Sequence, residues 1–146
     1  MTFQDYLAKT RSIAIEEKEV LDILRARPVD KITIRAAKSS LQTIIENSIG
    51  KAKKILQHYN CAVIPNESRD ALQILADCQA IDDETARTLF AAVGFRNAMI
   101  HDYMTFKDDI LIEILTHQKY NAIIDFLMDA CEYSDLIQRR ISNYSF

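Results

Sequence analysis

The residues best suited to chemistry lie in one short segment, where Arg96, Asn97, His101, Asp102 and Tyr103 fall within positions 96–103. A histidine near its ordinary pKa of about 6.5 can accept or donate a proton at neutral pH. An arginine offers a planar, permanently charged pair of donors that fits a phosphate and stabilises negative charge developing on it. The segment therefore has the groups for acid–base chemistry beside a phosphate.

The spacing of these residues limits how they can act together. Successive residues of a regular helix are rotated by about 100°, so Asn97 and His101 share a face, whereas Arg96 and His101 point about 140° apart. One undistorted helix cannot direct both Arg96 and His101 at the same substrate atom. Either the helix unwinds near His101, or two copies of the segment share their side chains across a dimer axis.

A purely structural interpretation also fits the segment. A histidine near a helix C-terminus is stabilised by the helix dipole, Arg96 could pair with a carboxylate, and Tyr103 could simply pack. Other enzyme signatures, such as a glycine-rich phosphate loop, GxSxG or HExxH, are absent from the sequence. His58, His101 and His117 are too scattered for a metal site on one helix face, so we expect no metal and no cofactor.

The elements that position this segment are predicted to be helices. The 146 residues include only two Gly and two Pro, too few for the tight turns of a sandwich, barrel or Rossmann domain. Apolar residues instead recur every three or four positions. This pattern predicts a first helix from Phe3 to about Arg25 and a second from Asp30, its N-cap, to about Tyr59. A third helix is predicted to begin at Ser68 as N-cap, and a fourth at the acidic residues Asp82–Glu84. A fifth is predicted to begin at a capping box, Thr105–Asp108, and to continue along the apolar face Ile110–Cys131.

Together these helices predict a single all-α domain, an antiparallel bundle of four to five main helices. We divide it into an N-terminal helix within residues 1–29, a core bundle over 30–131, and a tail over 132–146 that could add a last helix. Gly94 interrupts the fourth helix at a cost of about 1 kcal/mol, which a close contact with another helix would explain.

The charge distribution adds a candidate binding surface. Although the net charge is −3, the segment from Arg25 to Lys54 carries a net +6. It could form a basic strip that attracts phosphates, or a solvated helix face. No apolar run is long enough to span a membrane, and the charged N-terminal residues do not suggest export. Three widely spaced cysteines suggest buried thiols in a reducing cytoplasm rather than disulfides.

The segment Arg96-Asn97-Ala98-Met99-Ile100-His101-Asp102-Tyr103 resembles the R-x-x-x-x-H-x-Y motif of HEPN-domain proteins, specifically the HepT-like toxins of MNT/HEPN toxin–antitoxin systems. The flanking Val93-Gly94-Phe95 and the upstream Pro65–Asp70 segment are similar to the same branch. The resemblance covers about Lys31 to Met128 and leaves the N-terminal helix and the tail outside.

This resemblance implies an all-α homodimer whose paired motifs form an RNA-cleaving cleft. It also implies a partner, a small MNT-type nucleotidyltransferase antitoxin that transfers AMP to the motif tyrosine, here Tyr103. RNA contains its own nucleophile, the 2′-OH, so no metal is required. His101 would transfer the proton, Arg96 would stabilise the phosphate charge, and Asn97 and Asp102 would support them. RNA phosphates could extend over a set of basic residues: Lys31, Arg35, Lys38, Lys51, Lys53 and Lys54.

Two other functions fit the same residues. Arg96 and Tyr103 could hold a nucleotide without cleaving anything, which would make the chain a non-catalytic nucleotide- or substrate-binding partner of a nucleotidyltransferase. A plain dimerisation bundle is the third reading, and it predicts no growth phenotype on overexpression.

Overall fold

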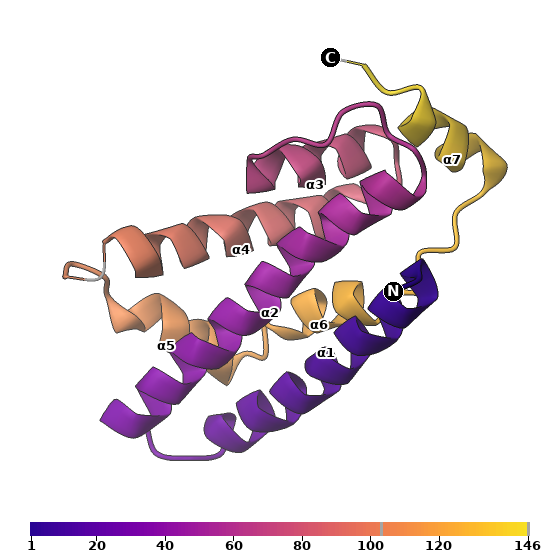
Figure 1. Ribbon diagram of the computed structural model, residues 1–146. Helices are drawn as coiled ribbons and strands as arrows, with labels where there is room; N and C mark the ends of the chain where they lie inside the picture. The colour runs from indigo at the N-terminus through magenta and orange to yellow at the C-terminus, as the bar shows by residue number, and fades with distance from the viewer. Residues whose placement is uncertain (103, 146) are drawn as a thin grey trace.

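The computed structural model describes residues 1–102 and 104–145, and this part of the chain forms helices and loops without a strand (Figure 1). The all-α fold class predicted from the sequence is therefore confirmed. The described helices are α1 (Phe3–Arg25), α2 (Lys31–His58), α3 (Ser68–Asp77), α4 (Asp83–His101), α5 (Asp108–Thr116), α6 (Asn121–Met128) and α7 (Asp135–Ser142).

Helix α2 is the centre of the bundle, since it packs against α1, α3, α4, α5 and α6. Figure 1 shows α1 antiparallel to α2, with α4 lying across the opposite side of α2. Leu41, Ile44, Ile55 and Leu56 on α2 are fully buried, as the predicted apolar stripe requires. Removing such side chains from water, at about 25 cal/mol per Å², is the main force that holds the helices together.

The predicted N-cap Asp30 is confirmed, and the fourth helix, predicted to open at Asp82–Glu84, has Asp82 as its N-cap. Asp30 accepts a hydrogen bond from the backbone N–H of Thr33 (2.8 Å), and Asp82 accepts one from Thr85 (2.7 Å). These bonds lower the pKa of both carboxyl groups. Each one satisfies a backbone donor that the first turn of a helix leaves unpaired. The long second helix and the fourth helix therefore begin where the sequence predicts.

The other two predicted caps are wrong. Ser68 is the first residue of α3 rather than its cap; Glu67 holds that position without a side-chain hydrogen bond. Thr105 does not cap α5, which begins at Asp108 after Lys107. The Thr105 hydroxyl instead donates to the carbonyl oxygen of Asp102 (3.3 Å), because the chain still turns there after the end of α4.

The single helix predicted along Ile110–Cys131 is divided into α5 and α6. The chain reverses at Gln118, whose φ of 52° lies in the left-handed region. The N–H of Gln118 bonds to the carbonyl of Leu115, and that of Lys119 to Ile114, which is the Schellman pattern of a helix end. Glycine usually occupies this position, so a glutamine there gives the sequence no visible stop signal.

The two ends of the chain also form helices. α1 packs against α2, α5 and α6. At the other end, Ser134 caps α7 by accepting from the N–H of Ile137 (3.3 Å), and Ile141 of α7 is fully buried. The predicted last helix in the tail is therefore confirmed. None of the helices of the described chain is sufficiently long and apolar to cross a bilayer.

The cysteines have the predicted state. Cys61, Cys78 and Cys131 are all buried and free, and burial raises the pKa of the Cys78 and Cys131 thiols. A buried thiol whose pKa is raised has little of the reactive thiolate form, so these side chains serve as core packing.

Candidate active site

Helix α4 carries the R-x-x-x-x-H segment through to its end. The helix continues to His101, and the N–H of Asp102 still bonds to the carbonyl oxygen of Ala98 (3.0 Å). The helix therefore does not unwind before His101, which removes the first of the two arrangements that the spacing allows. Arg96 and His101 consequently point about 140° apart around one helix. In a single chain they do not face a common point.

Arg96 is half-buried and held on two sides. Its Nη1 donates to the side-chain oxygen of Asn97 (2.9 Å), and its Nη2 lies 3.6 Å from a carboxylate oxygen of Glu46 on α2. The same Glu46 oxygen accepts a hydrogen bond from Gln42 (3.1 Å), one helical turn earlier. Arg96 Nε is buried, and none of the described residues accepts a hydrogen bond from it. The guanidinium is thus positioned between α2 and α4.

Glu46 is the residue that the sequence did not indicate. It lies fifty positions before Arg96, so no local motif joins the two. The packing of α2 against α4 brings them together. The prediction that Arg96 could pair with a carboxylate is correct. The partner is Glu46, and Asn97, expected on the side of His101, contacts Arg96 instead.

His101 and Asp102 are both exposed to solvent at the end of α4. His101 is therefore accessible to a substrate. Tyr103, the predicted modification site, lies outside the described residues. A cavity of about 500 Å³ beside this end of α4 is lined by Asp102, Phe106 and Ile110, among others, but not by Arg96 or His101. One chain therefore supplies the two groups on different surfaces.

The close helix contact expected at Gly94 is absent from the described chain. A Cβ placed on Gly94 would meet nothing within 4 Å, and the residue is exposed. Ala91, Gly94 and Ala98 instead line a shallow hollow with Ile110, whose side chain is 55% exposed. This hollow adjoins a second apolar one of about 460 Å³, which shares Ala91 and Ile110 with it. The part of α4 that carries Ala91, Gly94 and Ala98 is therefore apolar, and no other described residue covers it.

Three of the predicted basic residues lie together on the first half of α2. Lys31 and Arg35 are exposed. Lys38 pairs with Asp108 at the start of α5 (3.1 Å) and lies 5.1 Å from the ring centre of Phe106. Because Phe106 and Asp108 follow the motif closely in the chain, these cations lie towards the same end of the bundle as His101.

The remaining three basic residues are separated by the fold. Lys53 donates to the carbonyl oxygen of Asn66 (3.0 Å), and Lys54 lies over the ring of Tyr6. Both are at the C-terminal half of α2, away from Lys31. The six residues therefore do not form one continuous strip.

Lys51 is buried, which contradicts its prediction as a surface contact for RNA. Its Nζ donates to the carbonyl oxygens of Phe126 (2.5 Å), Leu127 (3.2 Å) and Asp129 (2.7 Å), where α6 ends. The last carbonyls of a helix lack partners within the helix, and the dipole favours a cation beside them. Burial nevertheless lowers the pKa of Lys51. The role of this lysine is structural, as a cap on α6.

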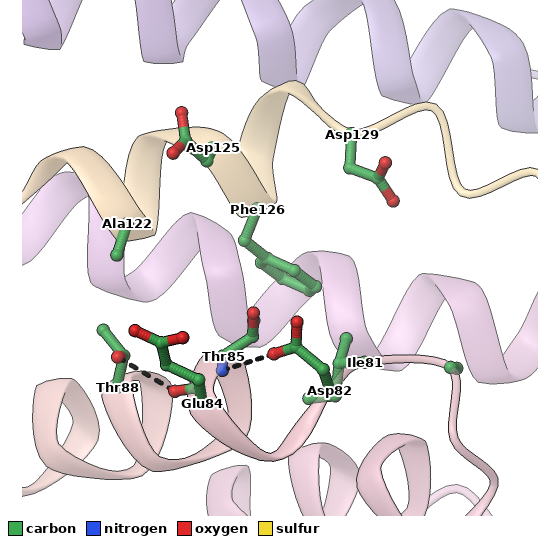
Figure 2. Close-up of a pocket in the computed structure, with 10 residues that line it drawn as sticks. Ile81, Asp82, Glu84, Thr85, Thr88, Ala122, Asp125, Phe126 and Asp129 are labelled. Carbon is green, nitrogen blue, oxygen red and sulfur yellow. Dashed lines mark hydrogen bonds between the residues drawn. The ribbon is translucent and has the colours of Figure 1, made fainter.

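A separate cavity of about 420 Å³ lies between the start of α4 and α6 (Figure 2). Asp82, Glu84, Asp125 and Asp129 surround it, so its negative charge disfavours phosphate groups. Figure 2 shows that Asp82 is already used in capping α4 through Thr85. The described residues contain no cluster of acids, histidines or cysteines that could hold a metal ion.

An all-α bundle whose central helices present an R-x-x-x-x-H segment at an exposed helix end is a HEPN-type domain. The chain belongs to the HepT-like ribonuclease family, whose sequence model matches residues 3–130. The predicted family is therefore confirmed. The match includes α1, so the expectation that the resemblance begins at Lys31 is wrong; in this chain α1 packs against α2 and α6.

One curated relative is the mRNA nuclease HepT of Shewanella oneidensis, which is 32% identical over 66 residues. This match covers 44% of the chain, and the chain spans about half the length of that relative.

Two solved structures share the fold. A toxin–antitoxin crystal structure with AMP-PNP has a TM-score of 0.70 and 22% identity, over 87% of this chain and 99% of that one. The tri-AMPylated Shewanella oneidensis HEPN toxin, solved in complex with an MNT antitoxin, has a TM-score of 0.74 and 23% identity, over 86% of this chain and 97% of that one.

Proposed function

We propose that the chain is the toxin of a toxin–antitoxin pair and acts as a metal-independent endoribonuclease. The observation that carries this proposal is the joint placement of Arg96 and His101 at the end of α4, with the imidazole exposed and the guanidinium held between helices. Family membership and the named activity of the Shewanella relative support it.

The reaction follows from the chemistry of these side chains. His101 accepts the proton of the ribose 2′-OH, and the 2′-oxygen attacks the adjacent phosphorus. The bond to the 5′-oxygen breaks, and an imidazolium returns a proton to that oxygen. Arg96 stabilises the additional negative charge on the phosphate as it forms. The products are a 2′,3′-cyclic phosphate and a free 5′-OH.

The active form in this proposal is a homodimer. Arg96 and His101 diverge on one helix, so a second copy is needed to bring a guanidinium and an imidazole to one phosphate. The apolar face formed by Ala91, Gly94 and Ala98 on α4, the helix that carries the motif, together with Ile110 on α5, is uncovered in the single chain. Close approach of two such faces would also explain why Gly94 is tolerated.

We assign RNA backbone contacts to five basic residues and exclude Lys51, which is buried. Lys31, Arg35 and Lys38 lie towards the motif and are the strongest of these candidates; Lys53 and Lys54 lie further along α2. Asn97 and Asp102 take supporting roles, Asn97 through its contact with Arg96 and Asp102 at the solvent-exposed end of α4.

The proposed partner is an MNT-type nucleotidyltransferase antitoxin, and the proposed location is the cytoplasm. The antitoxin would transfer AMP from ATP to the Tyr103 hydroxyl, with release of pyrophosphate. An adenylate there places negative charge and bulk next to His101, which opposes the entry of RNA phosphates.

The test of nuclease function compares the unmodified chain with His101→Ala on single-stranded RNA in EDTA. We expect cleavage by the former and a loss of at least about 100-fold in the variant, because general acid–base catalysis contributes on that order. If His101→Ala cleaves at the same rate, the mechanism is wrong. If neither cleaves but Arg96 is needed for nucleotide binding, the non-catalytic alternative is correct.

A further inference from the structure

The three nitrogen atoms of the Arg96 guanidinium have different surroundings. Nε and Nη2 form one edge of the group, and that edge faces α2, where Glu46 lies 3.6 Å from Nη2. Nε on this edge is buried, so a substrate phosphate has no access to it. Nη1 faces the other way and donates to Asn97, an exposed residue. A substrate phosphate can therefore approach Arg96 from the Nη1 side, whereas Nε is closed to it.

We infer that Glu46 is a positioning residue for the proposed RNA cleavage, an inference that rests on the proposed function. Its carboxylate holds Nη2 of Arg96 from α2, at a distance of 3.6 Å. The Nη1 side is left to a phosphate oxygen, which replaces the amide oxygen of Asn97 when RNA binds.

The two contacts of Arg96 differ in how readily they exchange. Asn97 offers a neutral amide oxygen, and a phosphate oxygen is a stronger acceptor for a guanidinium because it carries charge. Glu46 is itself charged, and Gln42 holds its carboxylate in place (3.1 Å). A phosphate therefore displaces Asn97 and leaves Glu46 in contact.

The same arrangement predicts the kinetic effect of losing Glu46. Without the carboxylate, the long Arg96 side chain can rotate away from the position in which it meets the scissile phosphate, and small errors of position are costly to catalysis. At the same time, removal of a negative charge near the site favours RNA binding. The expected signature is a lower kcat with an unchanged or lower KM.

The experiment measures kcat and KM for Glu46→Ala and Glu46→Gln on a defined single-stranded RNA in EDTA. We expect a roughly tenfold loss of kcat for Glu46→Ala and recovery to within about threefold of the unmodified chain for Glu46→Gln, whose amide oxygen can occupy the place of the carboxylate oxygen beside Nη2. Asp77→Ala is the matched control. Asp77 is an exposed acid on α3 that accepts from Gln73 one turn earlier (2.8 Å), as Glu46 accepts from Gln42.

A second measurement does not depend on cleavage. The Nε–H resonance of Arg96, assigned by its loss in Arg96→Lys, should exchange slowly with water in the unmodified chain and in Asp77→Ala. It should broaden in Glu46→Ala and stay sharp in Glu46→Gln, with circular dichroism showing that both variants keep their helices.

The outcomes distinguish a failure of the positioning role of Glu46 from a failure of the proposed nuclease activity. An unchanged kcat in both Glu46 variants, or the same Nε–H exchange in all variants, would overturn the positioning role. A kcat loss with equal loss in Asp77→Ala would overturn it too, since the effect would then be general. An unmodified chain that cleaves no RNA would instead refute the proposed nuclease, while the Nε–H signal would still show whether Glu46 holds Arg96.

Discussion

At the scale of single residues, the important contacts join side chains that are distant in the sequence. The spacing of Arg96 and His101 could be recognised directly, because both belong to one local motif. The contact of Arg96 with Glu46 could not, because it depends on how α2 packs against α4. The wrong prediction of Lys51 as a surface contact has the same origin. A lysine on a helix is normally solvated, and only the fold brings the carbonyl groups of α6 to its Nζ.

Tyr120 gives a prediction at this scale. It is fully buried and donates to Asp22 (2.5 Å); burial, together with the nearby carboxylate, raises its pKa to about 12. In the unfolded chain the phenol titrates near pH 10, so between about pH 10 and 12 the unfolded state binds fewer protons than the folded state. Stability should therefore fall as the pH rises through this interval.

Urea unfolding at pH 8 and at several values from 10 to 11.5 would measure the effect of Tyr120. We expect Tyr120→Phe to be less stable than the unmodified chain at pH 8, because Asp22 loses its donor, and to lose less stability on going to alkaline pH. Other tyrosines, such as Tyr133, also have raised pKa values. The free energy of unfolding of Tyr120→Phe should therefore still fall somewhat as the pH rises. Equal slopes in both proteins would refute this account of Tyr120.

At the scale of elements, helix starts were easier to predict than helix ends. Asp30 and Asp82 are strong cap residues placed just before apolar periodicity, and both caps are present. The ends at Asn60, Gln79 and Gln118 all use a left-handed residue that is not glycine. The end of α2 agrees with its prediction at about Tyr59, but neither of the two glycines lies at a helix end, so Gln79 and Gln118 give no glycine signal for a stop. This is why the sequence predicts one helix along Ile110–Cys131, where the structure has α5 and α6.

The left-handed Asn60 allows a test of this interpretation. Alanine in the left-handed region costs about 1–2 kcal/mol, whereas glycine pays no such cost, so Asn60→Gly should be about 1 kcal/mol more stable than Asn60→Ala. Gln57 lies three residues earlier, inside α2 and exposed, where the order should reverse and alanine should exceed glycine by about 1 kcal/mol. Urea unfolding of the four variants checks both orders. The same order at both positions would contradict the assignment of the helix end.

At the scale of the whole molecule, the central prediction is that each active site takes Arg96 from one protomer and His101 from its partner. Arg96→Ala and His101→Ala should each be inactive alone. When the two are unfolded together and refolded as a mixture, about half of the dimers are mixed and each contains one intact site, so about a quarter of the unmodified activity should return.

The control for this complementation mixes Arg96→Ala with the double variant Arg96→Ala/His101→Ala, which contains no intact arginine and should recover nothing. Sites formed within one chain would give no recovery in either mixture. The sequence is sufficient to suggest this test, because the angle of about 140° around the helix between Arg96 and His101 follows from helix geometry alone. The face of α4 that we propose as the dimer contact could not be predicted from the sequence, since Ala91, Gly94 and Ala98 look like ordinary helix surface.

The cap that Lys51 places on α6 has a consequence for how the protein is made. Residue 51 leaves the ribosome long before residues 126–129, which hold the three carbonyl oxygens that its ammonium group needs. Until then, burial of Lys51 in α2 would leave its ammonium group without hydrogen-bond partners. The bundle is thus completed only when nearly all of the domain has been translated. A chain translated from an mRNA that is cut before codon 126 lacks these carbonyl groups and cannot complete its core.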